Sequence, residues 1–216
     1  MRNRTLTIVI ALFLTNAGFL SAQTNQGKFL LAEMSNIDFI GAGTRSTMNF
    51  GWITYKAKSD AGEEDNPVKA FSLSLIPRVG YFVVNNLAVG LDISIDYSRS
   101  KRMNSDIITK YTQLTTGPFL RYYVPTKKFL PFAEANYSIG SSGYKWTSDN
   151  ADNEHKYQVQ QYGFGVGMGF PLGEKVSFDT LVGYQSHILK SKEDNEDNSR
   201  DIIGTIGLKL GLTIFL

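Results

Sequence analysis

Hydrophobic and polar residues alternate one by one through residues 70–100, AFSLSLIPRVGYFVVNNLAVGLDISIDYSRS. Between residues 87 and 98, Leu, Val, Ile and Tyr occupy every odd position, and small or polar residues occupy every even one. Successive side chains of a strand point to opposite faces, so this pattern predicts two β-strands, each with one apolar and one polar face. Asn85 and Asn86 lie between the two runs and predict a hairpin turn, because Asn tolerates the left-handed backbone conformation.

The same alternation recurs in the rest of the chain and predicts six further strands. It is most regular in residues 162–170, YGFGVGMGF, where glycine fills every second position. It is least regular in residues 27–39, because Glu33 shares a face with the apolar Phe29 and Leu31. The six predicted strands lie within residues 27–39, 111–124, 130–146, 155–172, 176–190 and 204–216.

The connections between the eight predicted strands alternate between long and short. Outer-membrane barrels have this asymmetry, with short periplasmic turns and longer external loops. Because bacterial single-chain barrels have an even number of strands, residues 46–58 are not assigned to a ninth strand. We assign them to a long first loop, residues 42–69, or to an extension of the first strand. The expected fold is all-β, an eight-stranded antiparallel up-and-down transmembrane β-barrel.

The volume of the barrel interior indicates which face points outward. The predicted strands together carry about 40 large apolar side chains, whereas the interior of an eight-stranded barrel is just filled by side chains or holds one small ligand. A soluble barrel with an apolar interior has no room for them, so we expect the apolar face to contact lipid. The small and polar face then lines the lumen, which suits the glycines of residues 162–170.

Aromatic residues gather toward both ends of the predicted strands. Tyr81, Tyr122 and Phe129 lie near short turns, whereas Tyr97 and Trp146 lie toward long loops. Outward-pointing aromatic rings at the two membrane interfaces are typical of transmembrane barrels. We therefore expect two aromatic girdles, with some of the rings pointing inward instead.

Charged residues occupy the polar face of several predicted strands and are therefore expected inside the lumen. Buried charges must be paired and hydrogen-bonded, so we predict an internal ion-pair network that fills the centre of the barrel. The alternative is an ion path along the same charges. The predicted members of this lumen charge network are Arg78, Asp92, Asp96, Arg121, Glu134, Asp179 and Lys209.

Residues 1–22 have the features of a secretory signal peptide, and residues 23–216 are the predicted barrel domain. Arg2 and Arg4 precede an apolar run, residues 6–14, that is too short to span a bilayer as a helix, which takes about 20 residues. Without these two arginines, 20 of the 22 Lys and Arg residues remain against 20 Asp and Glu, so the charge does not favour nucleic acid as a partner. The chain has no Cys, which excludes disulfides and thiolate metal sites.

Two segments, PRVGYFVVNNLAVGL (residues 77–91) and GPFLRYYVP (residues 117–125), resemble small bacterial outer-membrane β-barrel proteins. This family is the outer membrane protein beta-barrel domain, related in architecture to OmpX, OmpW and the OmpA barrel. The resemblance implies a location in the bacterial outer membrane, with membrane lipid and lipopolysaccharide as surroundings and the barrel-insertion machinery as a partner. That machinery reads a C-terminal aromatic residue in the family, whereas this chain ends in Phe215 and Leu216.

Some small barrels of this membrane are enzymes, and such an activity would need a nucleophile beside a base. The histidines are His155 and His187. Ser186 adjoins His187, but neighbours on a strand point to opposite faces and do not form a nucleophile–base pair. A lumen or loop-edge histidine is the simpler interpretation, and we expect no catalytic residue.

Three predicted loops, residues 59–66, 147–154 and 192–201, are dense in Asp, Glu and Asn. The simplest interpretation is that they are solvated loops. An alternative is that they bind divalent cations near lipopolysaccharide, because hard cations take several oxygen ligands, although their spacing matches no EF-hand. We expect no bound cofactor and no dedicated metal site.

The expected function is a non-enzymatic role in structure, surface interaction or adhesion through the external loops. The surface ligand is not specified by the sequence. The alternatives are a narrow channel for small solutes or ions and, second, a lipid-modifying outer-membrane enzyme.

Overall fold

The structure is a computed structural model that describes residues 23–40, 50–55, 58–59, 62–63, 68–103, 107–126, 128–148, 151–193 and 199–216. The predicted signal peptide lies outside these residues, as do parts of the three predicted acidic loops. In the described part of the chain, no helix has the length and apolar character needed to cross a membrane.

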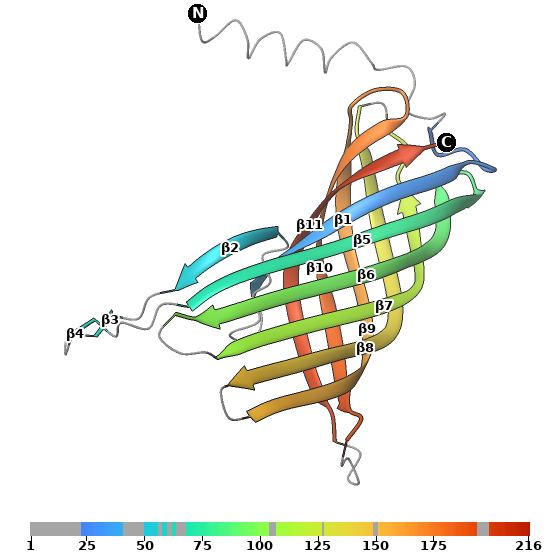
Figure 1. Cartoon of the computed structure of the whole chain (residues 1–216). Helices are drawn as coiled ribbons and strands as arrows, with labels where there is room; N and C mark the ends of the chain where they lie inside the picture. The colour runs from blue at the N-terminus through green and yellow to red at the C-terminus, as the bar shows by residue number, and fades with distance from the viewer. Residues whose placement is uncertain are drawn as a thin grey trace, which may run out of the picture.

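Eight strands form a closed antiparallel barrel in which each strand pairs with its neighbours along the chain (Figure 1). β1 closes the barrel, because Leu30 lies opposite Phe215 of β11 on one side and Gly80 of β5 on the other. The sequence-based prediction of an eight-stranded up-and-down barrel is confirmed. The strands of the barrel are β1 (Phe29–Ile40), β5 (Val68–Val84), β6 (Leu87–Arg102), β7 (Ile108–Tyr123), β8 (Leu130–Ser148), β9 (Ala151–Pro171), β10 (Val176–Ser191) and β11 (Asp201–Phe215).

Three short strands lie between β1 and β5: β2 (Phe50–Tyr55), β3 (Lys58–Ser59) and β4 (Gly62–Glu63). β1 pairs with β5 only as far as Met34 and continues along β11. β2 then takes its place on β5, antiparallel to it, from Phe50 opposite Leu73 to Tyr55 opposite Val68. The described part of residues 46–58 thus prolongs the line of the first strand, and β5 begins two residues before the predicted hairpin start at residue 70.

Apolar side chains point out of the barrel, as the alternation predicts, and small or polar ones point in over the half of the lumen nearer the loops, whereas large apolar side chains point in at the opposite end. On β9, Tyr162, Phe164 and Val166 are 44%, 62% and 69% exposed, whereas the preceding residue Gln161, which points into the lumen, is 3% exposed. β1 also alternates regularly, since Leu30 and Met34 are buried inside. Glu33 therefore lies on the outer wall among apolar side chains.

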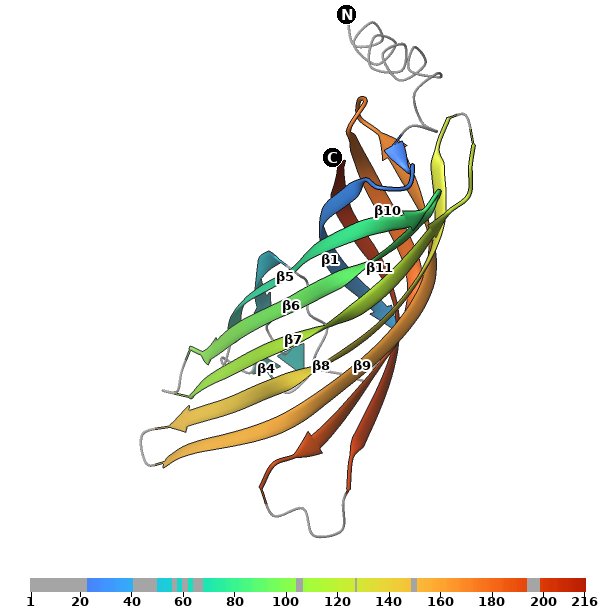
Figure 2. The same ribbon diagram turned by 90° about the vertical axis from the view of Figure 1, so that its right-hand side faces the viewer.

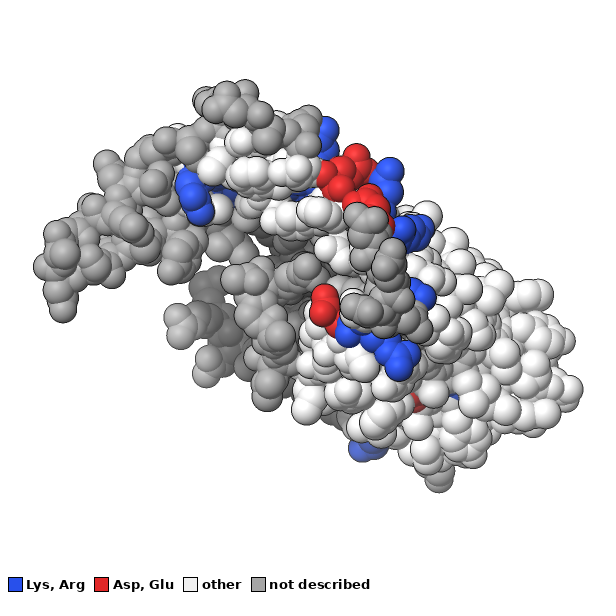
Figure 3. Space-filling model, turned by 90° about the horizontal axis from the view of Figure 1, so that it is seen from below, with Lys and Arg blue, Asp and Glu red and all other residues white. Residues whose placement is uncertain are grey.

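The two ends of the barrel differ. Short connections join β5 to β6, β7 to β8 and β9 to β10 at one end, and β6 is joined to β7, β8 to β9 and β10 to β11 at the other (Figures 1 and 2). We refer to these as the short-turn end and the loop end. The predicted loop 147–154 is mostly strand, because β8 runs to Ser148 and β9 begins at Ala151. Viewed from the loop end, the charged side chains of the described residues gather near the rim, whereas the wall that recedes from it is nearly uncharged (Figure 3). This distribution suits a wall surrounded by lipid.

Residues 23–28 form an N-terminal strap across the short-turn end. The predicted turn residue Asn86 has a left-handed backbone, with φ of 68°, and its side-chain oxygen accepts a hydrogen bond from Thr24 Oγ1 over 2.6 Å. Gln23 Nε2 donates to the backbone oxygens of Gly173 and Glu174 over 3.1 and 2.6 Å. The strap thereby joins the β5–β6 turn to the β9–β10 turn.

Candidate functional site

The lumen is filled with apolar side chains at the short-turn end. Tyr123 is at the centre of this layer, and its ring centroid lies 5.9 Å from that of Phe82 and 6.0 Å from that of Phe215. Gly167 makes room for Phe132, because a Cβ atom at residue 167 would lie 2.3 Å from that ring. The fully or almost fully buried aromatic residues of this layer are Phe82, Phe119, Tyr123, Phe132 and Phe215. These are the inward-pointing rings that the sequence predicts beside the girdles.

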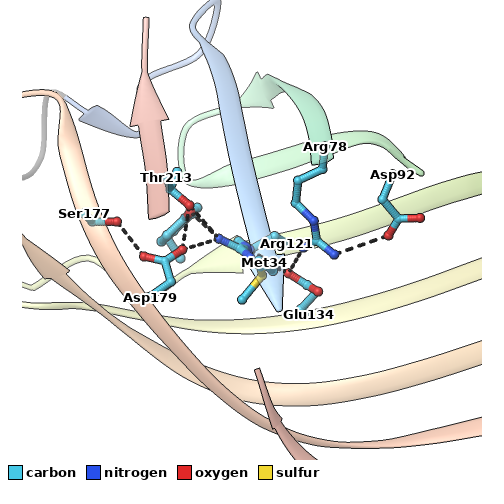
Figure 4. A network of polar contacts seen from close by, with 9 residues as sticks. Met34, Arg78, Asp92, Arg121, Glu134, Ser177, Asp179 and Thr213 are labelled. Atoms are coloured by element: carbon cyan, nitrogen blue, oxygen red, sulfur yellow. Dashed lines mark hydrogen bonds and ion pairs between the residues drawn. The ribbon is translucent and has the colours of Figure 1, made fainter. Parts of the chain in front are cut away.

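An ion-pair network lies directly above this layer (Figure 4). Arg121 lies between two carboxylates, with 2.7 Å to Glu134 Oε2 and 2.6 Å to Asp179 Oδ2. Arg78 shares Glu134 over 2.8 Å and reaches Asp92 over 3.3 Å. Five of the predicted lumen charges, from five different strands, are thus brought into one continuous network.

Neutral groups complete the coordination of these buried charges. Asp179 accepts hydrogen bonds from Ser177 Oγ over 2.5 Å and from Thr213 Oγ1 over 2.7 Å. The guanidinium of Arg121 lies 4.2 Å from the centroid of the Phe132 ring, which gives it a cation–π contact. Ion pairs without water are stable only when the remaining donors and acceptors are satisfied in this way.

The other two predicted charges are Asp96 and Lys209. Asp96 accepts hydrogen bonds from Ser74 Oγ over 2.5 Å, Ser94 Oγ over 2.9 Å and Gln113 Nε2 over 3.1 Å. It points inward like Asp92, but four residues of a strand separate the two by about 13 Å along the barrel. Lys209 lines the open part of the lumen close enough to Asp92 to interact with its charge.

A polar cavity of about 670 Å³ occupies the lumen between the ion-pair network and the loop end. Gln161 lines this cavity and links two of its strands to its own, because its Oε1 accepts from Ser138 Oγ of β8 over 3.1 Å and its Nε2 lies 2.9 Å from His187 Nδ1 of β10. The cavity lining also includes four amides that are not among the predicted lumen charges: Gln113, Asn136, Gln161 and Gln185. Their inward positions follow from the same alternation that places the charges in the lumen.

His187 points into this cavity and has no nucleophile beside it in the described part of the chain. Ser186 is fully buried on the opposite face of β10, and its Oγ has no hydrogen-bond partner among the described residues. His155 lies at the loop end, with its Nδ1 3.8 Å from Glu193. Over the same described residues, no three His, Cys, Asp or Glu side chains come together in a way that could hold a metal ion.

The family model "Outer membrane protein beta-barrel domain" matches residues 18–213 of the sequence. The chain belongs to this family. Its location is therefore the bacterial outer membrane. In such barrels the short turns face the periplasm and the longer loops face outward, so the filled half of the lumen is on the periplasmic side and the cavity is on the outer side.

Solved structures with the same fold share little sequence with this chain. Neisserial surface protein A is 18% identical, with 88% of this chain and 97% of that chain covered and a TM-score of 0.43. Ail, the attachment invasion locus protein of Yersinia pestis, is 14% identical, with 88% and 99% covered and a TM-score of 0.44. The outer membrane protease OmpT from Escherichia coli is 9% identical, with 88% and 94% covered and a TM-score of 0.43. No curated protein matches the sequence significantly.

Proposed function

We propose that this outer-membrane protein is a non-enzymatic surface protein that binds its partners at the outer end, through the external loops and the mouth of the cavity. One observation carries the proposal: the lumen is filled on the periplasmic side and hollow on the outer side. A molecule from outside can enter the cavity but meets the ion-pair network and the aromatic layer before it reaches the periplasm.

The filled half argues against the channel alternative. Arg121, Tyr123 and Phe82 are completely buried, and together they span the lumen with no water-exposed side-chain surface. The strap formed by residues 23–28 covers the same end from the periplasmic side. A steady ion path would require all of these groups to move.

The chemistry of the cavity argues against the enzyme alternative. General acid–base catalysis needs a base within hydrogen-bond reach of the group that it deprotonates. His187 bonds to an amide, Gln161, and the serine next to it points the other way. The lining rich in amides and hydroxyls suits reversible binding of a polar group.

Two measurements test the proposal with the full chain. In planar bilayers, we expect the purified protein to give no large, steady conductance. Long-lived open channels would instead support the channel alternative.

The second measurement tests whether cells that produce the protein attach to immobilised extracellular-matrix proteins. Replacement of residues 192–201 by a Gly-Ser linker of equal length should reduce attachment, whereas Glu174→Ala at the periplasmic turn should not. Equal attachment of cells with and without the protein would contradict adhesion.

A further inference from the structure

One group of polar side chains in the wall of the outer-side cavity is centred on Asp96 of β6. The Asp96 carboxylate accepts hydrogen bonds from Ser74, Ser94 and Gln113. Tyr111 Oη donates to Gln113 Oε1 over 2.6 Å, so the oxygen and the nitrogen of this amide are both engaged and its orientation is fixed. A carboxylate has about four acceptor positions, and the hydrogen bonds from described residues occupy three of those of Asp96.

A second group is centred on Gln161 of β9. Its Oε1 accepts from Gln185 Nε2 over 3.5 Å and from Thr115 Oγ1 over 3.4 Å. Its Nε2 is therefore the donor in the 2.9 Å contact with His187 Nδ1. Because Nδ1 accepts, it carries no proton, and the hydrogen of the neutral imidazole is on His187 Nε2. The network thus fixes the tautomer of His187 and makes its Nε2 a donor.

Asp96 and His187 lie on opposite sides of the lumen. Within the eight-stranded barrel, three strands separate β6 from β10 in either direction. Both side chains line the same cavity. The cavity therefore has a carboxylate acceptor on one wall and an imidazole donor on the opposite wall, each held in place by hydrogen bonds to its neighbours.

The rest of the lining is mainly neutral and rich in hydroxyl groups. Among its charged residues, Asp92 is paired with Arg78, and Arg99 and Arg102 lie near the end of β6, at the mouth of the cavity. Hydroxyl groups donate and accept hydrogen bonds equally well, so this lining suits a ligand with many hydroxyl groups of its own. The hydroxyl-bearing residues of the lining are Ser72, Ser94, Ser98, Ser100, Thr109, Tyr111, Ser138, Tyr144 and Thr205.

We propose that the outer-side cavity binds a neutral oligosaccharide from outside the cell. One sugar hydroxyl would donate to Asp96 and another would accept from His187 Nε2, and the ring of Tyr144 offers a flat surface for the apolar face of a sugar ring. The cavity volume of about 670 Å³ is in the usual range of ligand sites. This inference rests on the proposed function, because it names the class of molecule that the cavity takes.

Binding is tested with the full chain in lauryldimethylamine oxide, a detergent without a sugar headgroup that could compete. The labelled protein is applied to an array of neutral, sialylated and sulfated oligosaccharides, and the neutral sugar that is retained best is then titrated by calorimetry. We expect neutral sugars to be retained in preference to charged ones. His187→Phe should weaken binding by about tenfold, the usual effect of losing one hydrogen bond. The matched control is His155→Phe, which replaces the exposed histidine of the loop end and should bind like wild type.

NMR of the side-chain amides of the wild-type protein gives a second readout that needs no substitution. The same neutral sugar should shift the signals of Gln161 and Gln185, which line the cavity, and leave unchanged the signal of Gln160, which is exposed on the outer wall. Unchanged cavity amides would overturn the inference, and so would equal loss of binding in both histidine variants.

The array distinguishes this inference from the proposed function on which it rests. Retention of no neutral oligosaccharide, or a preference for sulfated ones, would overturn the inference. If cells still attached through the protein, the loops would then be the binding surface and the proposed function would stand. Long-lived open channels in planar bilayers would contradict the proposed function itself, whatever the sugar result.

Discussion

Arg121 and Asp179 are 58 residues apart in the sequence, yet Arg121 Nη1 donates to Asp179 Oδ2 over 2.6 Å, with both side chains completely buried. The pair links β7 to β10 across the barrel, because the two strands are not neighbours in the sheet. It therefore acts as an internal brace between opposite walls.

Loss of one member of this brace should strongly destabilise the barrel. Asp179→Ala leaves the Arg121 guanidinium with one carboxylate fewer in a fully buried site. We expect a decrease of about 3–5 kcal/mol in the free energy of unfolding, the usual cost of breaking a buried ion pair. Urea unfolding in lipid vesicles, followed by tryptophan fluorescence, measures it. The double variant Arg121→Met, Asp179→Leu should lose less free energy of unfolding than Asp179→Ala, because it leaves no unpaired charge at this position. A larger loss in the double variant would show that other contacts of Arg121 and Asp179 contribute more than their mutual ion pair.

The ion-pair network should also keep the lumen closed. Arg78→Ala, Arg121→Ala and Glu134→Ala, combined, remove the long side chains that bridge the lumen while deleting two positive charges and one negative charge. We expect this variant to show conductance steps in planar bilayers that the wild type lacks. The triple alanine variant of Lys28, Lys128 and Lys175 at the short-turn end serves as a control for altered charge. If the network variant remained closed, the aromatic layer alone would be sufficient to seal the barrel.

Gly167 should tolerate no side chain. An added Cβ atom would lie 2.3 Å from the Phe132 ring and 2.5 Å from the backbone oxygen of Thr180. Gly167→Ala should therefore lower the free energy of unfolding by about 1–3 kcal/mol, as overpacking does. Gly143→Ala is the matched control, because its nearest contact is the Thr112 hydroxyl at 3.3 Å, and it should change stability by less than about 0.5 kcal/mol. Equal effects in urea titrations would argue against tight packing at Gly167.

Glu33 is a charged residue on the lipid-facing wall, opposite Leu212 of β11 and Pro77 of β5. A charge in this position is unfavourable in a depth-dependent way. Glu33→Leu should therefore stabilise the barrel in vesicles by about 1 kcal/mol, with Glu33→Gln giving a smaller gain. The measurement is urea unfolding in vesicles, with the same variants compared in detergent. A loss of stability in vesicles would indicate that Glu33 has a partner in the membrane.

Period-two alternation predicted the eight strands of the barrel, and the connection lengths and the volume of the interior then predicted the closed barrel and the face that points outward. The alternation placed Arg78, Arg121 and Glu134 in the lumen because each has apolar neighbours on both sides along its strand. Glu33 was the apparent exception on β1, yet the alternation holds there as well. Glu33 points outward as the alternation requires, and it is unusual only because its side chain is charged.

Alternation says nothing about height along the barrel, because height depends on the register between strands. Asp92 and Asp96 have the same face and the same charge, but only Asp92 reaches Arg78. The place of β2 beside β5 could not be predicted either, because its pairing depends on where β1 leaves β5.

The N-terminal strap has a consequence for the order in which the chain assembles. Gln23 is hydrogen-bonded to Gly173 and Glu174, which follow it by 150 and 151 positions in the sequence. Thr24 is hydrogen-bonded to Asn86, which follows it by 62 positions. Contacts of such long range form late, because the intervening chain must be ordered first. The strap engages both turns only when β5, β6, β9 and β10 are already in place, so protection of residues 23–28 from proteases would mark the completion of barrel assembly.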